Sequence, residues 1–382
     1  MMMKTYFSIF FSIAILLLFS GCISPFEPKG ASVEGLLVVE GDIVLNDTTV
    51  ITLSRSSAIS SNQTVKYVFN ATVWVESSEG IIVYGIPKLS NGVYAYKIPT
   101  SGLNRKAMYR LKVRIPGSGE YESPFMSVLE TPDIENISWK VDSLYHTVTF
   151  YVSSKGSDIA SNYYRWNYSE DWEFTARYNT YVYYDEVRNK IIDTALNWYY
   201  CYKKDVSKGV YVANTSGFSE NKVYNKPIAT FGNHDDRLSV LYSMEVTQRS
   251  LTREGYIYWE NIGRNSSELG GIFSPQPSEV RGNITSLSNP DEVVLGYISA
   301  VVTKKKRIFA YAKDIKLFSF NDDCSIIENV PLGSFLEMKR SGYELLGYDE
   351  LEHTSLWTMK KCVDCRLSGS KLRPSFWPLN HY

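Results

Sequence analysis

The sequence has few of the side chains, and none of the short motifs, on which the common enzyme chemistries depend. Four histidines occur among its 382 residues, scattered along the chain: His146, His234, His353 and His381. It contains no Gly-x-Ser-x-Gly pentapeptide of the serine hydrolases, no P-loop, no dinucleotide-binding glycine fingerprint after a strand and no His-Glu-x-x-His zinc pair. We therefore expect no catalytic residues and no cofactor. A carboxylate pair for glycoside hydrolysis would leave no such motif, because its spacing is spatial.

Side chains that could hold a metal are equally sparse. Only His234-Asp235-Asp236 groups three of them, and neighbours along an extended segment point to opposite faces. The run predicts a turn between strands, with a metal or general-base site as the alternative.

The sequence also lacks an excess of charge. Lysine and arginine number 40 and the acidic residues 41, which leaves a net charge of -1. Recognition of nucleic acid needs a clustered basic field, so we expect no such partner. The single basic run, Lys304 to Arg307, lies between apolar segments at 293–302 and 307–312. It predicts a hairpin turn between two strands, with an anion or headgroup contact as the alternative.

Helical periodicity is scarce, whereas residues typical of strands are abundant. The chain has 29 Tyr, 17 Phe and 8 Trp, and Val, Ile and Thr recur at alternate positions, so the predicted fold class is mainly β. One helix is expected over residues 251–262, capped by Ser250 and ended by Gly263. Its apolar stripe should pack on a sheet and consists of Leu251, Gly255, Tyr258, Trp259 and Ile262.

The only long apolar run, Tyr6 to Phe19, stands at the N-terminus after the single charge of Lys4. At about 14 residues it is shorter than the ~20 of a membrane-spanning helix, and it leads into Leu18-Phe19-Ser20-Gly21-Cys22. This pattern predicts a lipoprotein signal peptide over residues 1–21, lipidation of Cys22 and a tether over 22–34, which together give a domain on a lipid anchor. An uncleaved membrane helix is the alternative.

The remaining chain is longer than one hydrophobic core usually holds, so two domains are expected. Residues 35–131 contain about seven short strands with frequent turns, among them Glu79-Gly80 and Asn91-Gly92. This spacing predicts an antiparallel sandwich of immunoglobulin-like architecture. A proline closes the pattern at Pro132, and residues 132–382 are expected to form a larger β-rich domain that carries the helix and a Cys-x-x-Cys tail.

Four cysteines are left after Cys22: Cys201, Cys324, Cys362 and Cys365. Export would place them in an oxidising compartment, where three disulfide pairings are possible. We favour a local Cys362–Cys365 bridge together with Cys201–Cys324. A metal site or a redox role for the Cys-Val-Asp-Cys pair is less favoured, because no second such pair exists and this one lies in a proline-rich tail.

Thirteen aromatic residues lie between Tyr163 and Tyr200. In the strand predicted over 163–174, the alternate residues 164, 166 and 168 share one face. Such rings could form a platform that stacks a sugar or a peptide, or they could fill the inner face of a large sheet. The candidate contact residues for a ligand or partner are Trp166, Trp172 and Trp198.

Several short motifs occur in a distinctive order along almost the whole chain. They are the lipobox at Cys22, Leu37 to Gly41, Tyr163 to Trp166, Gly270 to Phe273, Gly282 to Ile284, Leu295 to Tyr297, and the Cys-x-x-Cys pair before Pro374 to Trp377. Together they resemble the Bacteroidetes lipoprotein family catalogued as domain of unknown function 4249.

This resemblance implies location and partners more than mechanism. Members look like outer-membrane lipoproteins encoded beside a TonB-dependent receptor, which implies an accessory role in substrate capture or uptake. The family offers no catalytic residues to carry over. Surface-displayed lipoproteins often carry acidic residues soon after the lipidated cysteine, whereas here only Glu27 follows within 23–27, so a surface and a periplasmic orientation both stay open.

The sequence is compatible with three functions. The first is a lipid-anchored accessory or ligand-binding protein that pairs with a TonB-dependent receptor in nutrient uptake. The second is a structural or adhesive envelope lipoprotein in which the aromatic residues form the core. The third is a surface hydrolase with a carboxylate pair that no motif reveals.

Overall fold

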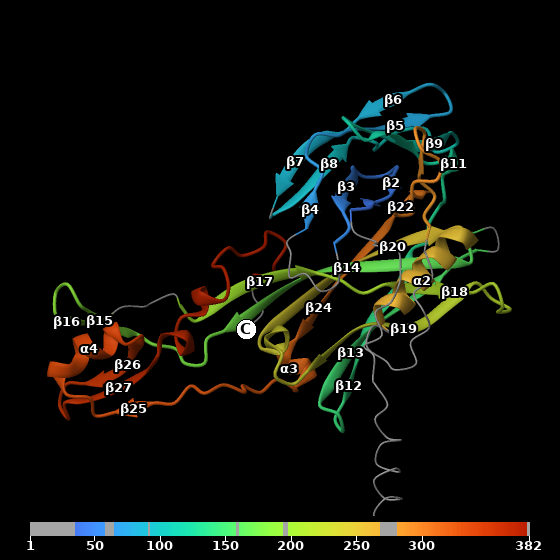
Figure 1. The fold of residues 1–382 in the computed structure, drawn as a ribbon. Coiled ribbons are helices and arrows are strands. Elements are labelled where there is room, and N and C mark those ends of the chain that lie inside the picture. The colour runs from blue at the N-terminus through green and yellow to red at the C-terminus, as the bar shows by residue number, and fades with distance from the viewer. Residues whose placement is uncertain are drawn as a thin grey trace, which may run out of the picture.

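The computed structural model describes residues 35–57, 65–90, 92–157, 160–193, 198–267 and 281–379. The protein is mainly β, as predicted, and its strands gather into three bodies (Figure 1). We call them the first sandwich, the second sandwich and the distal module. Several predicted features lie outside the described residues: the signal peptide, Cys22, the tether, the Gly270 to Phe273 motif and His381. Among the described residues, no helix is both long and apolar enough to cross a membrane.

The first sandwich packs two sheets around one core. One sheet has the order β22-β1-β3-β8-β7, with β4 paired to β3; the other has the order β21-β10-β9-β5-β6, with β11 paired to β9. The bounds are β1 (Leu37–Glu40), β2 (Ile43–Val44), β3 (Thr49–Arg55), β4 (Lys66–Tyr67), β5 (Thr72–Ser77), β6 (Ile82–Tyr84), β7 (Ile86–Ser90), β8 (Val93–Ile98), β9 (Met108–Ile115), β10 (Gly119–Glu122), β11 (Met126–Ser127), β21 (Thr285–Ser286), β22 (Val294–Leu295) and β23 (Ala300–Val301). The hairpins expected at Glu79-Gly80 and at 91–92 are confirmed by the pairing of β5 with β6 and of β7 with β8.

Residues 284–302 return from late in the chain to complete the first sandwich. Strand β21 pairs with β10, β22 runs parallel to β1, and β23 runs parallel to β2. Two glycines permit this close approach: a Cβ on Gly296, where φ is +124°, would lie 1.9 Å from the Val39 carbonyl oxygen, and one on Gly282 would lie 1.6 Å from the Gly296 oxygen. The first body is therefore built from two separate stretches of chain, whereas the sequence placed residues 284–302 in the C-terminal domain.

The predicted hairpin around Lys304 to Arg307 is wrong. These residues begin β24 (Lys304–Tyr311), which pairs antiparallel with β20 (Leu241–Leu251), while β23 before them belongs to the first sandwich. The basic side chains meet acidic or carbonyl groups of the protein. Lys304 pairs with Asp133, Lys305 with Asp47 and Arg307 with Glu245, at 2.8, 2.7 and 3.1 Å. The run therefore connects segments of this chain and leaves little charge for an external anion.

The second sandwich holds the long strands of the middle of the chain. A three-stranded sheet of order β12-β13-β19 packs on a sheet of order β17-β14-β20-β24, in which β18 also pairs with β14. The remaining bounds are β12 (Ile134–Asp142), β13 (Thr147–Lys155), β14 (Tyr163–Thr175), β17 (Tyr200–Val206), β18 (Tyr211–Asn214) and β19 (Lys222–Gly232), with α3 (Ala312–Ile315) after β24. Tyr164, Trp166 and Tyr168 are buried on the same face of β14, as the period-two pattern predicted.

A buried ion cluster joins the two sandwiches. Asp42, which follows β1, lies 2.7 Å from Arg165 of β14 and 3.1 Å from Arg249 of β20. The other oxygen of this carboxylate accepts the backbone N–H of Ser299, which belongs to the returning segment. Burial, and then the charge of Arg165, lower the pKa of Arg249 to about 10. One carboxylate thus fixes three stretches of chain at the boundary of the sandwiches.

The helix predicted over residues 251–262 is present, but both of its ends differ from the prediction. It is α2 (Arg253–Ser267), so Ser250 does not cap it and Gly263 does not end it. Ser250 belongs to β20, and its hydroxyl donates to the Glu130 carbonyl oxygen. Thr252 takes the cap position instead, because its hydroxyl oxygen accepts the N–H of Gly255 at 3.1 Å. β20 continues to Leu251, because this residue pairs with Tyr163 of β14, so Leu251 belongs to the strand and not to the helix. Gly255 and Tyr258 of the predicted stripe are buried as expected.

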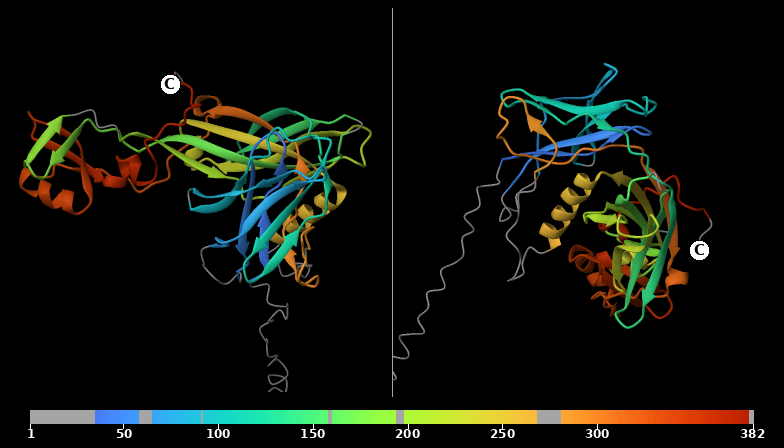
Figure 2. Two further views of the ribbon diagram at one scale, coloured as in Figure 1. Left: turned by 90° about the horizontal axis from the view of Figure 1, so that it is seen from above. Right: turned by 90° about the vertical axis from the view of Figure 1, so that its right-hand side faces the viewer.

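The distal module projects from one end of the second sandwich (Figure 2). It combines the hairpin β15 (Val182–Asp185) and β16 (Lys190–Asp193) with β25 (Ile327–Glu328), β26 (Tyr343–Asp349), β27 (Thr354–Met359) and α4 (Phe335–Arg340). Tyr184, Phe335, Leu345 and Trp357 form its own core. Two segments about 140 residues apart build it, so the C-terminal part of the chain contains two cores where one was predicted.

Candidate functional site

The three tryptophans that the sequence predicted as contact residues differ in their burial. Trp166 is 1% exposed, and its indole N–H donates to Gln248 Oε1 at 2.7 Å. Trp172 is 5% exposed, and its indole N–H donates to Asp236 Oδ1 at 3.0 Å. Both rings fill the second sandwich, so their prediction as ligand or partner contacts is wrong. In a strand with alternating aromatic residues, the rings on the inner face pack in the core and are not exposed to a ligand.

Trp198 has a different environment, because it is half-buried beside an open depression in the distal module. The depression has a volume of about 500 Å³, and we call it the distal pocket. Its lining residues are Tyr183, Tyr184, Asp185, Glu186, Val187, Trp198 and Lys339. Three aromatic side chains, two carboxylates and one ammonium group therefore line this depression.

The hairpin β15–β16 sets the direction of the side chains on one wall. Tyr184 turns inward, with its ring centroid 5.7 Å from that of Phe335 and 6.4 Å from that of Trp357. Neighbouring strand residues point to opposite faces, so Tyr183 turns outward. The Asp185 carboxylate accepts the N–H groups of Val187 and Arg188 at 2.9 and 3.0 Å, which fixes the turn that carries Glu186.

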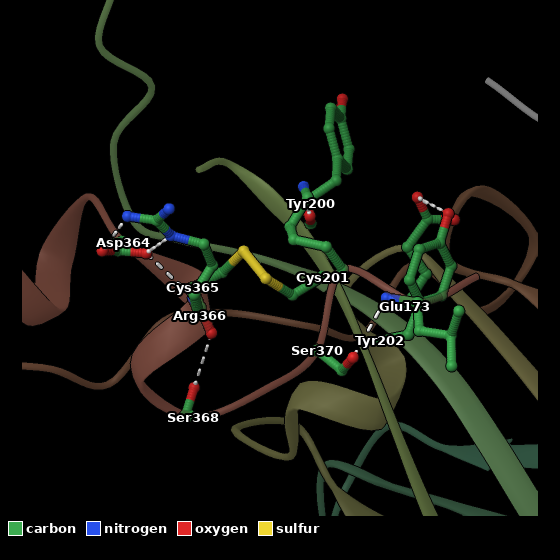
Figure 3. Close-up of a disulfide and its surroundings, with 11 residues drawn as sticks. Glu173, Tyr200, Cys201, Tyr202, Asp364, Cys365, Arg366, Ser368 and Ser370 are labelled. Atoms are coloured by element: carbon green, nitrogen blue, oxygen red, sulfur yellow. Dashed lines mark hydrogen bonds and ion pairs between the residues drawn. A yellow bond between two sulfur atoms is a disulfide. The ribbon is translucent and has the colours of Figure 1, made fainter. Parts of the chain in front are cut away.

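Trp198 forms the other wall and is held in place by the Cys-x-x-Cys tail. Its carbonyl oxygen accepts the N–H of Cys365 at 2.9 Å, and the Arg366 guanidinium lies 4.6 Å from its ring centre. Arg366 also donates twice to Asp364, at 2.8 Å each (Figure 3). Burial would raise the pKa of Asp364, but the hydrogen bonds from Arg366 outweigh it and lower that pKa.

The favoured disulfide pairing is wrong. Cys365 is joined to Cys201 of β17, as Figure 3 shows, and Cys362 is joined to Cys324. The two tail cysteines lie in separate short turns, η3 (Lys360–Cys362) and η4 (Cys365–Leu367). Their side chains therefore form disulfides with different cysteines. One bridge ties the tail to the second sandwich, and the other ties it to the segment that leads into the distal module.

The electrostatic character of the distal pocket is acidic. Lys339 lies 2.5 Å from Glu344, whose side chain is 2% exposed, so the charge of this lysine is already matched. Asp185 pairs with Arg188 at 3.6 Å, whose side chain is largely exposed, and no ion pair of Glu186 occurs among the described residues. The pocket can therefore stack a ring against its aromatic walls and attract a neutral or cationic group.

The His234-Asp235-Asp236 run forms the predicted turn. It lies between β19 and β20 and leads into η1 (Asp236–Leu238), which Asp235 caps. Asp236 is engaged by Lys203 at 2.5 Å, and the His234 ring nitrogen contacts the Ser319 carbonyl oxygen at 2.9 Å. No group of three or more metal-ligand side chains occurs among the residues that the structure describes.

Sequence reasoning found one wall of the distal pocket and missed the other. Lys339 lies more than 140 positions after Trp198, and no spacing rule connects them. Tyr183 and Asp185 belonged to the predicted aromatic-rich stretch, but only the hairpin geometry shows which of its rings face outward. The turn chemistry of Asp185 was the one local signal that could have located this wall.

A family model described as "Domain of unknown function (DUF4249)" matches residues 23–307. No curated protein matches the chain. Among solved structures, a chain titled "Cytokine receptor complex - Crystal form 1A" is similar at 10% identity and a TM-score of 0.19, covering 56% of this chain and 84% of that chain. Likeness at that level carries no argument. The family match includes Tyr183 and Trp198 but ends before Lys339.

Proposed function

This chain belongs to the family of the domain of unknown function DUF4249, and we propose that it is a lipid-anchored outer-membrane protein that captures a ligand beside a TonB-dependent receptor during nutrient uptake. The lipobox at Cys22 and the family resemblance support the anchor, the location and the partner. The proposal contains no catalytic step.

The distal pocket is the observation that carries the binding role. It brings Tyr183 and Trp198 to the surface of a module that extends away from the two sandwiches. Both walls are fixed before any ligand arrives, one by the Asp185 turn and the other by the Cys201–Cys365 bridge. A pre-formed site with aromatic walls and few polar groups is typical of small-ligand recognition.

The anchor and the partner are tested in one fractionation experiment. Tagged wild-type protein and a Cys22→Ser variant are expressed in the native cells, and outer membranes are solubilised in mild detergent. We expect the wild type in the outer membrane together with a receptor barrel, and the variant outside it. Repeated recovery of the wild type without a barrel would contradict the receptor partnership, and membrane retention of Cys22→Ser would contradict the lipid anchor.

A structural or adhesive role is the second candidate, because most of the aromatic residues that suggested binding prove to be core. Trp166 and Trp172 lie inside the second sandwich. That candidate requires the distal pocket to be dispensable. Deletion would then change attachment or surface integrity and leave growth on every nutrient unchanged.

A further inference from the structure

A second depression, of about 450 Å³, lies where β18 meets β19 on the second sandwich. We call it the β18–β19 groove, and we propose that it is a binding site for an acidic sugar. The polar, charged and aromatic side chains that line it include Asn214, Phe218, Lys222, Tyr224, Asn225 and Lys226. This inference does not rest on the proposed function, because it concerns a different body of the molecule.

An irregular pairing in β19 shapes one wall of the groove. Opposite β13, Val152 pairs with Lys226 and Ser154 pairs with Val223, so two residues of β19 face the single Ser153. Asn225 takes a left-handed backbone with φ of 47°. Ser153 holds this conformation, because its hydroxyl oxygen accepts the N–H of Asn225 at 3.0 Å. Bulges and left-handed residues gather at functional sites, where they re-aim a side chain.

The bulge turns an aromatic ring into solvent. Tyr224 is 75% exposed, and Phe218, which lines the same groove, is 70% exposed. Within the part of the chain that the structure describes, neither ring is in contact with another aromatic ring. Exposed rings that line one depression offer the flat apolar faces on which the C–H face of a sugar ring stacks.

The charge of the groove selects an acidic ligand. Its lining contains two lysines and no carboxylate. Lys222 lies 3.5 Å from Glu135, which is itself half-exposed, while Lys226 has no ion pair among the described residues. The side-chain oxygens of Asn214 and Asn225 accept hydrogen bonds within the protein, at 2.8 and 3.3 Å. No acceptor for their amide N–H groups occurs among the described residues, so these groups can donate to carboxylate or hydroxyl oxygens.

The test is isothermal titration calorimetry on the protein purified in detergent from the native cells. The probes are a galacturonic acid trimer and the neutral galactose trimer of the same linkage. The variants are Tyr224→Ala and Lys226→Gln, with Tyr145→Ala as the matched control, since Tyr145 is 73% exposed in the β12–β13 turn and lies outside the groove. Trp198→Ala separates this site from the distal pocket.

We expect the acidic trimer to bind at least about tenfold more tightly than the neutral one. Tyr224→Ala should weaken that binding by about tenfold, the loss of one stacked ring, and Lys226→Gln by about fivefold. Tyr145→Ala and Trp198→Ala should bind like the wild type. The inference is overturned if the acidic trimer does not bind, if both trimers bind equally, or if Tyr224→Ala and Lys226→Gln keep wild-type affinity. A loss shared by Tyr145→Ala would overturn it as well.

Discussion

Cys365 is joined to Cys201 across 164 positions of sequence, although Cys362 lies only three positions before it. This bridge fastens the tail that carries Arg366 to the edge strand of the second sandwich, and it thereby fixes Trp198 at the distal pocket. The position of the pocket wall depends on this long-range bond.

Loss of the bridge should loosen the distal module without unfolding the sandwiches. In Cys201→Ser/Cys365→Ser we expect a local loss of about 2–4 kcal/mol and faster protease cleavage in residues 178–199 and 323–365. Limited proteolysis with mass spectrometry measures both the cleavage sites and, in unreduced wild type, the bridged peptides. A wild-type peptide that links Cys362 to Cys365 would contradict the pairing.

The tryptophans should differ strongly in their contribution to stability. Trp166→Ala removes a fully buried ring and one of the two donors to Gln248 Oε1, so we expect a loss of about 3–5 kcal/mol in the free energy of unfolding. Trp198→Ala removes a half-buried ring and should cost less than about 1.5 kcal/mol. Urea unfolding followed by circular dichroism measures both. Equal losses would mean that Trp198 is a core residue and not a pocket wall.

Gly296 should tolerate no side chain. A methyl group there would meet the Val39 carbonyl oxygen at 1.9 Å, on a backbone with φ of +124°, so Gly296→Ala should destabilise the protein by more than about 2 kcal/mol. Gly333→Ala is the matched control, because nothing lies within 4 Å of its added methyl group. The difference is measured as the midpoints of thermal unfolding of both variants. If the two midpoints agree, the parallel pairing of β22 with β1 is not as described.

The Asp364–Arg366 pair should give a small, pH-dependent stabilisation. The folded-state pKa of Asp364 lies below its usual value of 3.8, so the contribution is fully present above pH 3.8 and disappears as the pH falls through the folded-state value. Arg366 is 44% exposed, which limits the effect to less than about 1 kcal/mol. Urea unfolding of Asp364→Asn should show lower stability than wild type at pH 7 and a smaller gap at pH 3. A gap that widens towards acid would show the opposite sign.

Local patterns predicted the parts of this fold that depend on local chemistry. Turn residues at Glu79-Gly80 located a hairpin, and the period of two in β14 located its buried face. The pattern failed where a distant strand competed for the same residues. Ser250 joined the β14–β20 ladder instead of capping α2, and Lys304 to Arg307 extended a strand because β20 offered them partners.

The candidate site was harder to foresee, because its parts come together only in space. Trp198 was identified by residue type alone, and so were Trp166 and Trp172, which proved to be buried. Nothing in the sequence distinguishes an exposed ring from a buried one when both lie in the same aromatic-rich stretch. Disulfide pairing has the same limitation, since three pairings fit four cysteines and only the fold selects one.

Ligand capture by the distal pocket is the central claim, and a growth measurement in the native cells tests it most directly. The chromosomal gene is replaced by Trp198→Ala/Glu186→Gln, or by the control Tyr181→Ala, whose ring is 65% exposed in the same module and does not line the pocket. With equal levels of both variants in the cells, the pocket variant should grow at least about threefold more slowly on one sole nutrient, while the control grows like wild type. Wild-type growth of the pocket variant on every nutrient that requires the intact gene would contradict the claim.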